Sequence, residues 1–148
     1  TTAVTPSVHP VEQRHTNTFT ITPATDPVEG ERREAALVER FVDWLRRQGH
    51  TVTAHHYDIV APALRSDLAD ETTQRIWEAK ADTGRTSVRT AIGQLIDYLR
   101  FEPEHWSGGI LLPHRPSDDL LALITGAAGR AVAWPTSPTE FQVEEPSA

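Results

Sequence analysis

The only lysine of the chain, Lys80, follows an acid by two residues in the strand-like segment that ends Glu78-Ala79-Lys80. Alternate side chains of a strand share a face, so Glu78 and Lys80 are expected to point the same way. A carboxylate beside a compact ammonium group is suited to binding a divalent ion and orienting a water molecule. The same spacing also describes an ordinary exposed ion pair on a sheet, so other residues must join the pair before it indicates a site.

Two further acids are candidates. Asp67 lies in the preceding strand-like segment, and if the two segments form a hairpin, Asp67 approaches Glu78 and offers a second carboxylate to Mg²⁺ or Mn²⁺. Glu34 shares the apolar stripe of a predicted helix with Val38, where a carboxylate needs a partner. The helix dipole is an alternative reason for an acid so early in a helix. Together the acids suggest that a metal-bound water, held by Lys80, attacks a phosphodiester.

A second predicted helix carries polar residues on both flanks of its apolar stripe. Ser87, Gln94 and Tyr98 lie on one flank and Arg89 on the other. We expect Arg85 and Arg89, at the start of this helix, to contact phosphates, because a helix N-terminus also favours anions. For each residue taken singly, hydrogen bonding to polar groups at the edge of the core is the simpler explanation.

The elements that must position these residues follow from hydrophobic periodicity and from the turn residues. Together they predict a mixed sheet flanked by helices, in the order α-β-β-β-α-β-α-β. The helices are expected at residues 29–48, from 85 to just before Pro103, and at 117–124. The strands are expected at residues 50–60, 63–70, 74–81, 109–113 and 131–134, with residues 18–22 as an optional edge strand.

Composition suggests one domain with two appendages. Residues 1–28 read as an irregular arm or linker, 29–135 as the domain, and 136–148 as an acidic, proline-containing tail. The absence of cysteine excludes disulfides, thiolate metal sites and a cysteine nucleophile, and favours a cytoplasmic protein. No apolar stretch could span a membrane. The chain has no methionine, so we expect a segment of a longer protein, and its net charge of −7 argues against broad nonspecific binding to nucleic acids.

Other motifs favour different chemistry only weakly. His50, His55 and His56 could suggest zinc, but His55 and His56 are adjacent and point to opposite faces of a strand, so we interpret all three as surface histidines. The pair Gly108-Gly109 precedes a strand instead of opening a helix, which is not the context of a phosphate-binding loop.

The helix acid, the strand aspartate, the Glu-x-Lys strand and the glutamine-bearing helix together resemble the PD-(D/E)xK nuclease superfamily, which has a restriction endonuclease-like fold. The resemblance covers about residues 29–134. Its most specific parts are Ser66-Asp67-Leu68, Glu78-Ala79-Lys80 and residues 89–98, which are similar to nuclease domains appended to larger bacterial proteins. One departure is Ser66, which stands where the motif has proline, and this lowers the specificity of the match.

The resemblance implies a role for each matching residue. Divalent metal would be bound by Asp67, Glu78, the carbonyl of Ala79 and Glu34. Lys80 would orient the attacking water and stabilise charge on the phosphate, and Gln94 would support the lysine or contact DNA. The implied DNA contacts are Arg85, Ser87, Arg89 and Tyr98.

The expected function is therefore a Mg²⁺-dependent endonuclease acting on DNA, in which Mn²⁺ substitutes for Mg²⁺. It would be the cleavage module of a restriction or defence protein, with recognition domains elsewhere in a longer chain. Homodimerisation and action on RNA stay open. Two alternatives remain: a catalytically inactive nuclease-like module for DNA binding or assembly, and a structural domain whose acids form surface ion pairs and bind protein partners.

Overall fold

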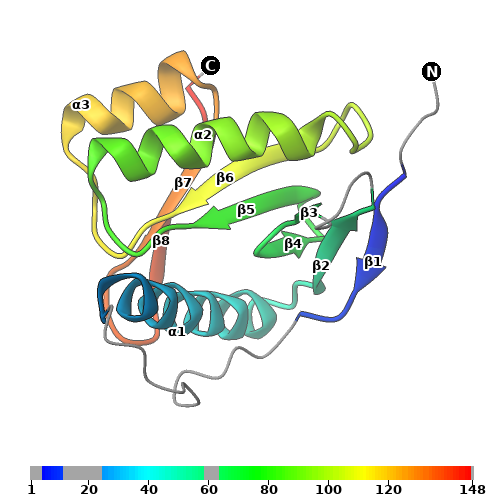
Figure 1. Cartoon of the computed structure of the whole chain (residues 1–148), viewed down its shortest axis with the longest axis horizontal. Helices are drawn as coiled ribbons and strands as arrows, with labels where there is room; N and C mark the ends of the chain where they lie inside the picture. Colours follow the sequence, from blue (N-terminus) through cyan, green and yellow to red (C-terminus); the bar gives the residue numbers. More distant parts are fainter. Residues whose placement is uncertain (1–4, 12–24, 59–63, 148) are drawn as a thin grey trace.

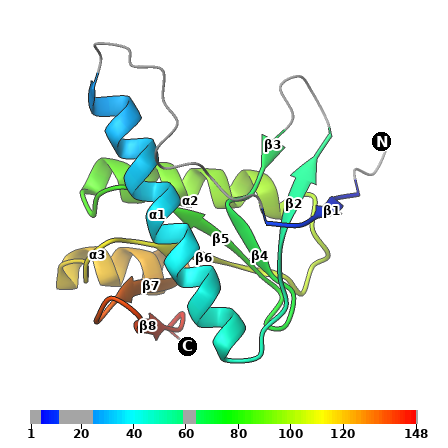
Figure 2. The ribbon, with the colours of Figure 1, turned by 90° about the horizontal axis from the view of Figure 1, so that it is seen from below.

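The structure is a computed structural model that describes residues 5–11, 25–58 and 64–147. Its centre is a mixed eight-stranded sheet with α1 (Thr25–Arg47) on one face and α2 (Arg85–Leu99) and α3 (Asp118–Leu121) on the other (Figure 1). Viewed from the side of α1, this helix crosses the sheet diagonally (Figure 2). The predicted mixed α/β class, with helices flanking a mixed sheet, is confirmed.

The helices are α1 (Thr25–Arg47), α2 (Arg85–Leu99) and α3 (Asp118–Leu121), and α3 continues into a π-helical segment, η1 (Ala122–Ala127). The strands are β1 (Ser7–His9), β2 (Val52–Tyr57), β3 (Leu64–Arg65), β4 (Leu68–Asp70), β5 (Arg75–Ala79), β6 (Ser107–Leu111), β7 (Ala131–Pro135) and β8 (Phe141–Glu144). Their order is β1-β2-β4-β5-β6-β7-β8, with β3 also on β2. Strands β5, β6 and β7 are parallel because α2 and then α3 return the chain across the sheet, and the other pairs are antiparallel.

Helix α1 forms because its apolar residues repeat with helical spacing. Val38, Phe41 and Leu45 are buried, and Phe41 meets the ring of Trp77 on β5 edge to face at 4.9 Å. The helix ends where Gly49 takes a φ of 87°, a conformation that glycine adopts without strain. The outer face of α1 is polar, and none of the helices described is both long and apolar enough to cross a membrane.

The Trp77 side chain also explains why residue 109 is a glycine. It pairs in register with Gly109 of the parallel strand β6, and a Cβ built on Gly109 would lie 2.6 Å from the indole ring. The large side chain therefore fits between α1 and the sheet only because its neighbour has no side chain. On the opposite face, Ile76 and Ile110 pack with the buried side of α2.

Both predicted appendages contribute strands. Strand β1 lies in the expected irregular arm and pairs with β2, whereas β8 lies in the expected tail and pairs with β7. Phe141 of β8 is buried and packs edge to face against Phe41 at 5.0 Å. The sheet thus extends beyond residues 29–135 at both ends. The optional strand at residues 18–22 lies outside the described residues.

Two predicted elements are interrupted. The single strand expected at residues 63–70 is β3 followed by β4, with a break at Ser66 and Asp67. The helix expected at residues 117–124 begins at the predicted cap, where the Ser117 hydroxyl accepts a hydrogen bond from the Leu120 amide at 3.3 Å. It then widens into η1 instead of continuing as an α-helix.

Candidate active site

A β-bulge positions Asp67. His56 pairs with Arg65 and Thr53 with Ala69, so β2 advances three residues while the opposite chain advances four. Ser66 fixes this irregularity: its amide donates to the His55 carbonyl at 2.9 Å, and its hydroxyl accepts from the His55 amide at 3.1 Å. The extra residue disrupts the ladder locally, which is how bulges redirect side chains.

The redirected Asp67 side chain reaches β5. Its Oδ2 atom accepts a hydrogen bond from the amide of Ala79 at 2.8 Å. The β4–β5 register pairs Leu68 with Trp77, so its continuation by one residue sets Asp67 opposite Glu78. The structure therefore brings together the two acids that the sequence suggested would meet across a hairpin.

Lys80 follows β5 and lies beside both Glu78 and α2. Its amide donates to the Leu111 carbonyl at 3.0 Å, which continues the pairing with β6. Its Nζ atom lies 3.5 Å from Glu78 Oε2 and donates to Gln94 Oε1 at 2.5 Å. The Lys80 and Glu78 side chains are 13% and 6% exposed, so the pair is not an ordinary exposed surface ion pair.

Glu78 is held in an environment that opposes its ionisation. Burial raises its pKa to about 9; the negative charge of Asp67 adds to this effect and Lys80 counteracts it. Its Oε1 atom is buried and has no hydrogen-bond partner among the described residues. A buried acceptor of this kind is costly, and a cation that replaced the proton would stabilise the ionised carboxylate.

Glu34 has a weaker link to the group. It is partly buried on α1, at the edge of the apolar stripe, and its charge makes a small contribution to the raised pKa of Glu78. Across residues 5–11, 25–58 and 64–147, no three histidine, aspartate or glutamate side chains are grouped to hold one ion. Within the part of the chain that the structure describes, Asp67 and Glu78 are thus an acid pair with no third carboxylate grouped with them to hold one ion.

The predicted α2 residues divide into two groups. Tyr98 is buried, and its pKa is raised by burial and then by the charges of Glu78 and Asp67, while a hydrogen bond with Gln94 acts in the opposite direction. Arg85, Ser87 and Arg89 lie instead at the start of α2, where Arg85 forms an exposed ion pair with Asp119 and the Ser87 hydroxyl donates to Asp82 at 2.9 Å. Arg89 is exposed.

A cleft of about 520 Å³ adjoins Lys80 on the side of α1. It lies between that helix and the segments that follow β5 and β6, a usual position for ligands in sheets with parallel strands. No prediction made from the sequence included this cleft. The spacing of Arg33 and Arg40, which puts them on one face of the helix, was a usable signal. Residues that line it include Arg33, Arg40, Ala81, Thr83, Pro113 and His114.

The burial of one histidine corrects the prediction that His50, His55 and His56 all lie at the surface. His55 is only 3% exposed, so interpreting all three as surface histidines was wrong for this residue. His50 instead contacts Asp70, and His56 stacks on His9 with ring centroids 3.7 Å apart. The partners of His55 are distant in sequence, which is why local spacing could not reveal them.

Comparison of the chain with protein-family models, with curated proteins and with solved structures gave no match.

Proposed function

We propose that this chain is a Mg²⁺-dependent nuclease domain of the restriction endonuclease-like type, which hydrolyses phosphodiester bonds of DNA. The observation that carries the proposal is the close grouping of Asp67, Glu78 and Lys80, with Gln94 hydrogen-bonded to the lysine. Such a site combines metal-binding oxygens with a positive group for the phosphate. The adjoining cleft is lined by Arg33 and Arg40 beside one acid, Asp82, and the two arginines would attract a polyanionic substrate.

The residues fit a magnesium ion. Mg²⁺ is usually bound by one or two carboxylates while it keeps several waters, and Asp67 and Glu78 supply that number. The buried Oε1 atom of Glu78 has no hydrogen-bond partner among the described residues, and burial and then the charge of Asp67 raise the pKa of Glu78, so a bound cation would offset the cost of ionising this carboxyl group. The carbonyl of Ala79 is a further candidate ligand, whereas Glu34 is suited to a role through charge or through water. The bound ion would supply a polarised water and neutralise charge on the phosphate.

The protein side chains have separate tasks in this proposal. Gln94 holds the Lys80 ammonium group, which would donate hydrogen bonds to the attacking water or to a phosphate oxygen. Arg33 and His114 in the cleft would contact the backbone on one side of the scissile phosphate, and Arg89 at the start of α2 would contact it on the other. The two arginines would place positive charge beside the site in a chain whose net charge is −7.

A cleavage assay tests the function. Supercoiled plasmid, modified plasmid and RNA would be incubated with the protein and Mg²⁺ or Mn²⁺, and with EDTA as the blank. We expect wild type to cleave DNA, Lys80→Ala and Asp67→Ala to lose at least about 100-fold in rate, and Glu39→Gln, which removes an exposed acid of α1, to behave as wild type.

The outcomes separate the alternatives. Equal behaviour of wild type and Lys80→Ala on every substrate would refute the catalytic proposal. Binding of DNA without cleavage would favour the inactive nuclease-like module. Calorimetric titration with Mn²⁺ adds an independent measurement, because Asp67→Ala should abolish the binding heat whether or not a substrate has been found.

A further inference from the structure

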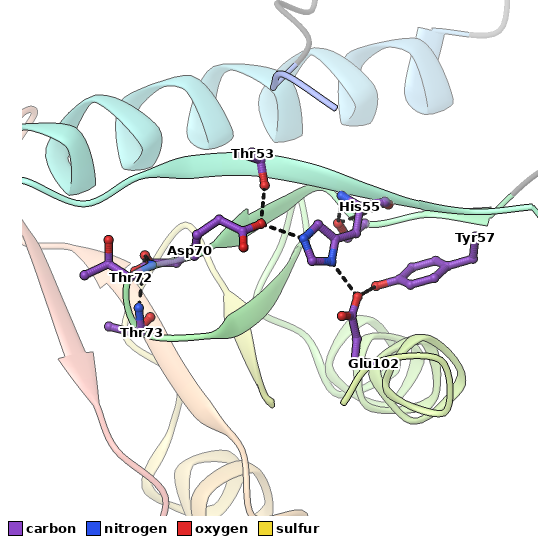
Figure 3. A network of polar contacts seen from close by, with 9 residues as sticks. Thr53, His55, Tyr57, Asp70, Thr72, Thr73 and Glu102 are labelled. Carbon is purple, nitrogen blue, oxygen red and sulfur yellow. Dashed lines mark hydrogen bonds and ion pairs between the residues drawn. The ribbon is translucent and has the colours of Figure 1, made fainter. Parts of the chain in front are cut away.

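A buried histidine of β2, His55, bridges two acids (Figure 3). His55 Nδ1 lies 2.6 Å from Glu102 Oε2, and His55 Nε2 lies 2.6 Å from Glu71 Oε2. A neutral imidazole has one N–H group, whereas a protonated imidazole donates from both ring nitrogens and so satisfies both carboxylates at once. We assign His55 this protonated state, in which it is a cation held between two anions.

The surroundings of His55 agree with this charge state. Burial by itself would lower its pKa, but the hydrogen bonds with Glu102 and Glu71 outweigh burial and the pKa is raised. The same Glu71 oxygen accepts a hydrogen bond from the Thr53 hydroxyl at 2.7 Å, and the Trp106 ring lies 4.9 Å from the His55 ring. Glu71, Glu102 and Tyr57 are the titratable groups that face the imidazole.

The network continues toward the candidate site through two tyrosines. The Tyr57 hydroxyl donates to the Glu102 oxygen that also contacts His55, at 2.6 Å. The Tyr57 ring stacks on Tyr98 with centroids 5.5 Å apart and an interplanar angle of 15°. Tyr98 in turn interacts with Gln94, which accepts the hydrogen bond of Lys80.

We propose that His55, Glu102 and Tyr57 are positioning residues for Lys80. Protonated His55 fixes Glu102, Glu102 fixes the Tyr57 hydroxyl, and the Tyr57 ring supports Tyr98, which lies on α2 one turn after Gln94. When His55 loses a proton, one carboxylate faces a ring lone pair, the contact becomes repulsive, and the support of Tyr98 loosens. Only the consequence for cleavage rests on the proposed function, because the positioning itself is a property of the fold.

Lys80 allows a direct test because it is the only lysine of the chain. Protein labelled with ¹³C at lysine Cε gives one lysine resonance, which would be followed by NMR from pH 5 to 10 together with the ring resonances of His55. We expect the Lys80 resonance to show an inflection at the His55 midpoint. His55→Gln should remove it, whereas His50→Gln, which deletes the separate contact with Asp70, should preserve it.

Tyr57→Phe distinguishes support through the ring stack from a through-space effect of charge. This variant keeps the ring but loses the hydroxyl that binds Glu102, so His55 should still titrate while the Lys80 inflection is lost. Glu78 should give the Lys80 resonance a separate inflection near pH 9 in every variant. Absence of an inflection at the His55 midpoint in wild type, or its persistence at that pH in His55→Gln, would overturn the proposal. If His55→Gln does not fold, the wild-type and Tyr57→Phe titrations decide the question.

Cleavage supplies the functional readout. Wild-type kcat should fall as pH rises through the His55 midpoint, and Tyr57→Phe should lower kcat below that pH with little change in KM. Coupling in the NMR titration without any DNA cleavage would refute the nuclease function and leave the positioning network supported. Cleavage with a pH profile identical in wild type, His55→Gln and Tyr57→Phe would refute the network alone.

Discussion

Replacing Glu78 with glutamine should stabilise the metal-free protein, and the gain should depend on pH. The folded chain holds the Glu78 pKa at about 9, against an ordinary value of 4.5. Between these values the folded state binds the proton more tightly than the unfolded state, so the contribution of Glu78 to stability falls as pH rises. At pH 7.5 this amounts to about three units at 1.36 kcal/mol each, or up to about 4 kcal/mol.

Glutamine keeps the shape of the side chain and has no proton to gain. The free energy of unfolding of Glu78→Gln should therefore exceed that of wild type by up to about 4 kcal/mol at pH 7.5, but by less than about 1 kcal/mol at pH 5. Urea denaturation in EDTA at both pH values measures the difference. Glu39→Gln, at an exposed position, serves as the control. A change of equal size at both pH values, or destabilisation at pH 7.5, would refute the electrostatic argument.

Three further substitutions test catalysis and packing. Lys80→Arg keeps the charge, but its planar guanidinium does not reproduce the contact with Gln94, so plasmid cleavage should fall by about 100-fold or more; near-normal cleavage would argue against water positioning by Lys80. Gly109→Ala places a methyl group 2.6 Å from the Trp77 ring and should destabilise the fold by about 1–3 kcal/mol in urea denaturation, and an unchanged midpoint would contradict the described packing. Phe141→Ala should lower the free energy of unfolding by about 3–5 kcal/mol because β8 belongs to the core, whereas an effect below about 0.5 kcal/mol would mean that the tail is dispensable.

The sequence predicted the parts of the fold that local periodicity specifies. The stripes of α1 and α2 repeat over several turns, and each is buried as a helix against the sheet. Strands β1 and β8 were missed because each is short and is stabilised by pairing with a neighbour instead of by its own pattern. Prolines and acids around β8 also obscured the alternation that starts at Phe141.

The candidate site was predictable to a similar degree. Glu78 lies in β5 and Lys80 directly follows this strand in extended pairing with β6, so their proximity follows from alternation, and Gln94 lies on the next helix, on the face that returns to the sheet. The bulge at Asp67 depends on Ser66 bonding to His55, eleven residues away, and no local spacing encodes such a bond. The contact between His55 and Glu102 spans 47 residues, so a local sequence pattern could not predict it either.

The bulge should respond differently to a substitution and to a deletion in its segment. A substitution at Ser66 removes the hydroxyl bond to His55 but keeps the backbone bond and the residue count of the segment, so we expect the interruption between Arg65 and Ala69 to persist. Deletion of one residue there would allow β3 and β4 to pair with β2 as one regular strand, which is a better ladder by itself. Such a shortened protein could gain thermal stability and still lose the Asp67 contact with β5. The length of this segment, more than the identity of each residue in it, is then what the site requires.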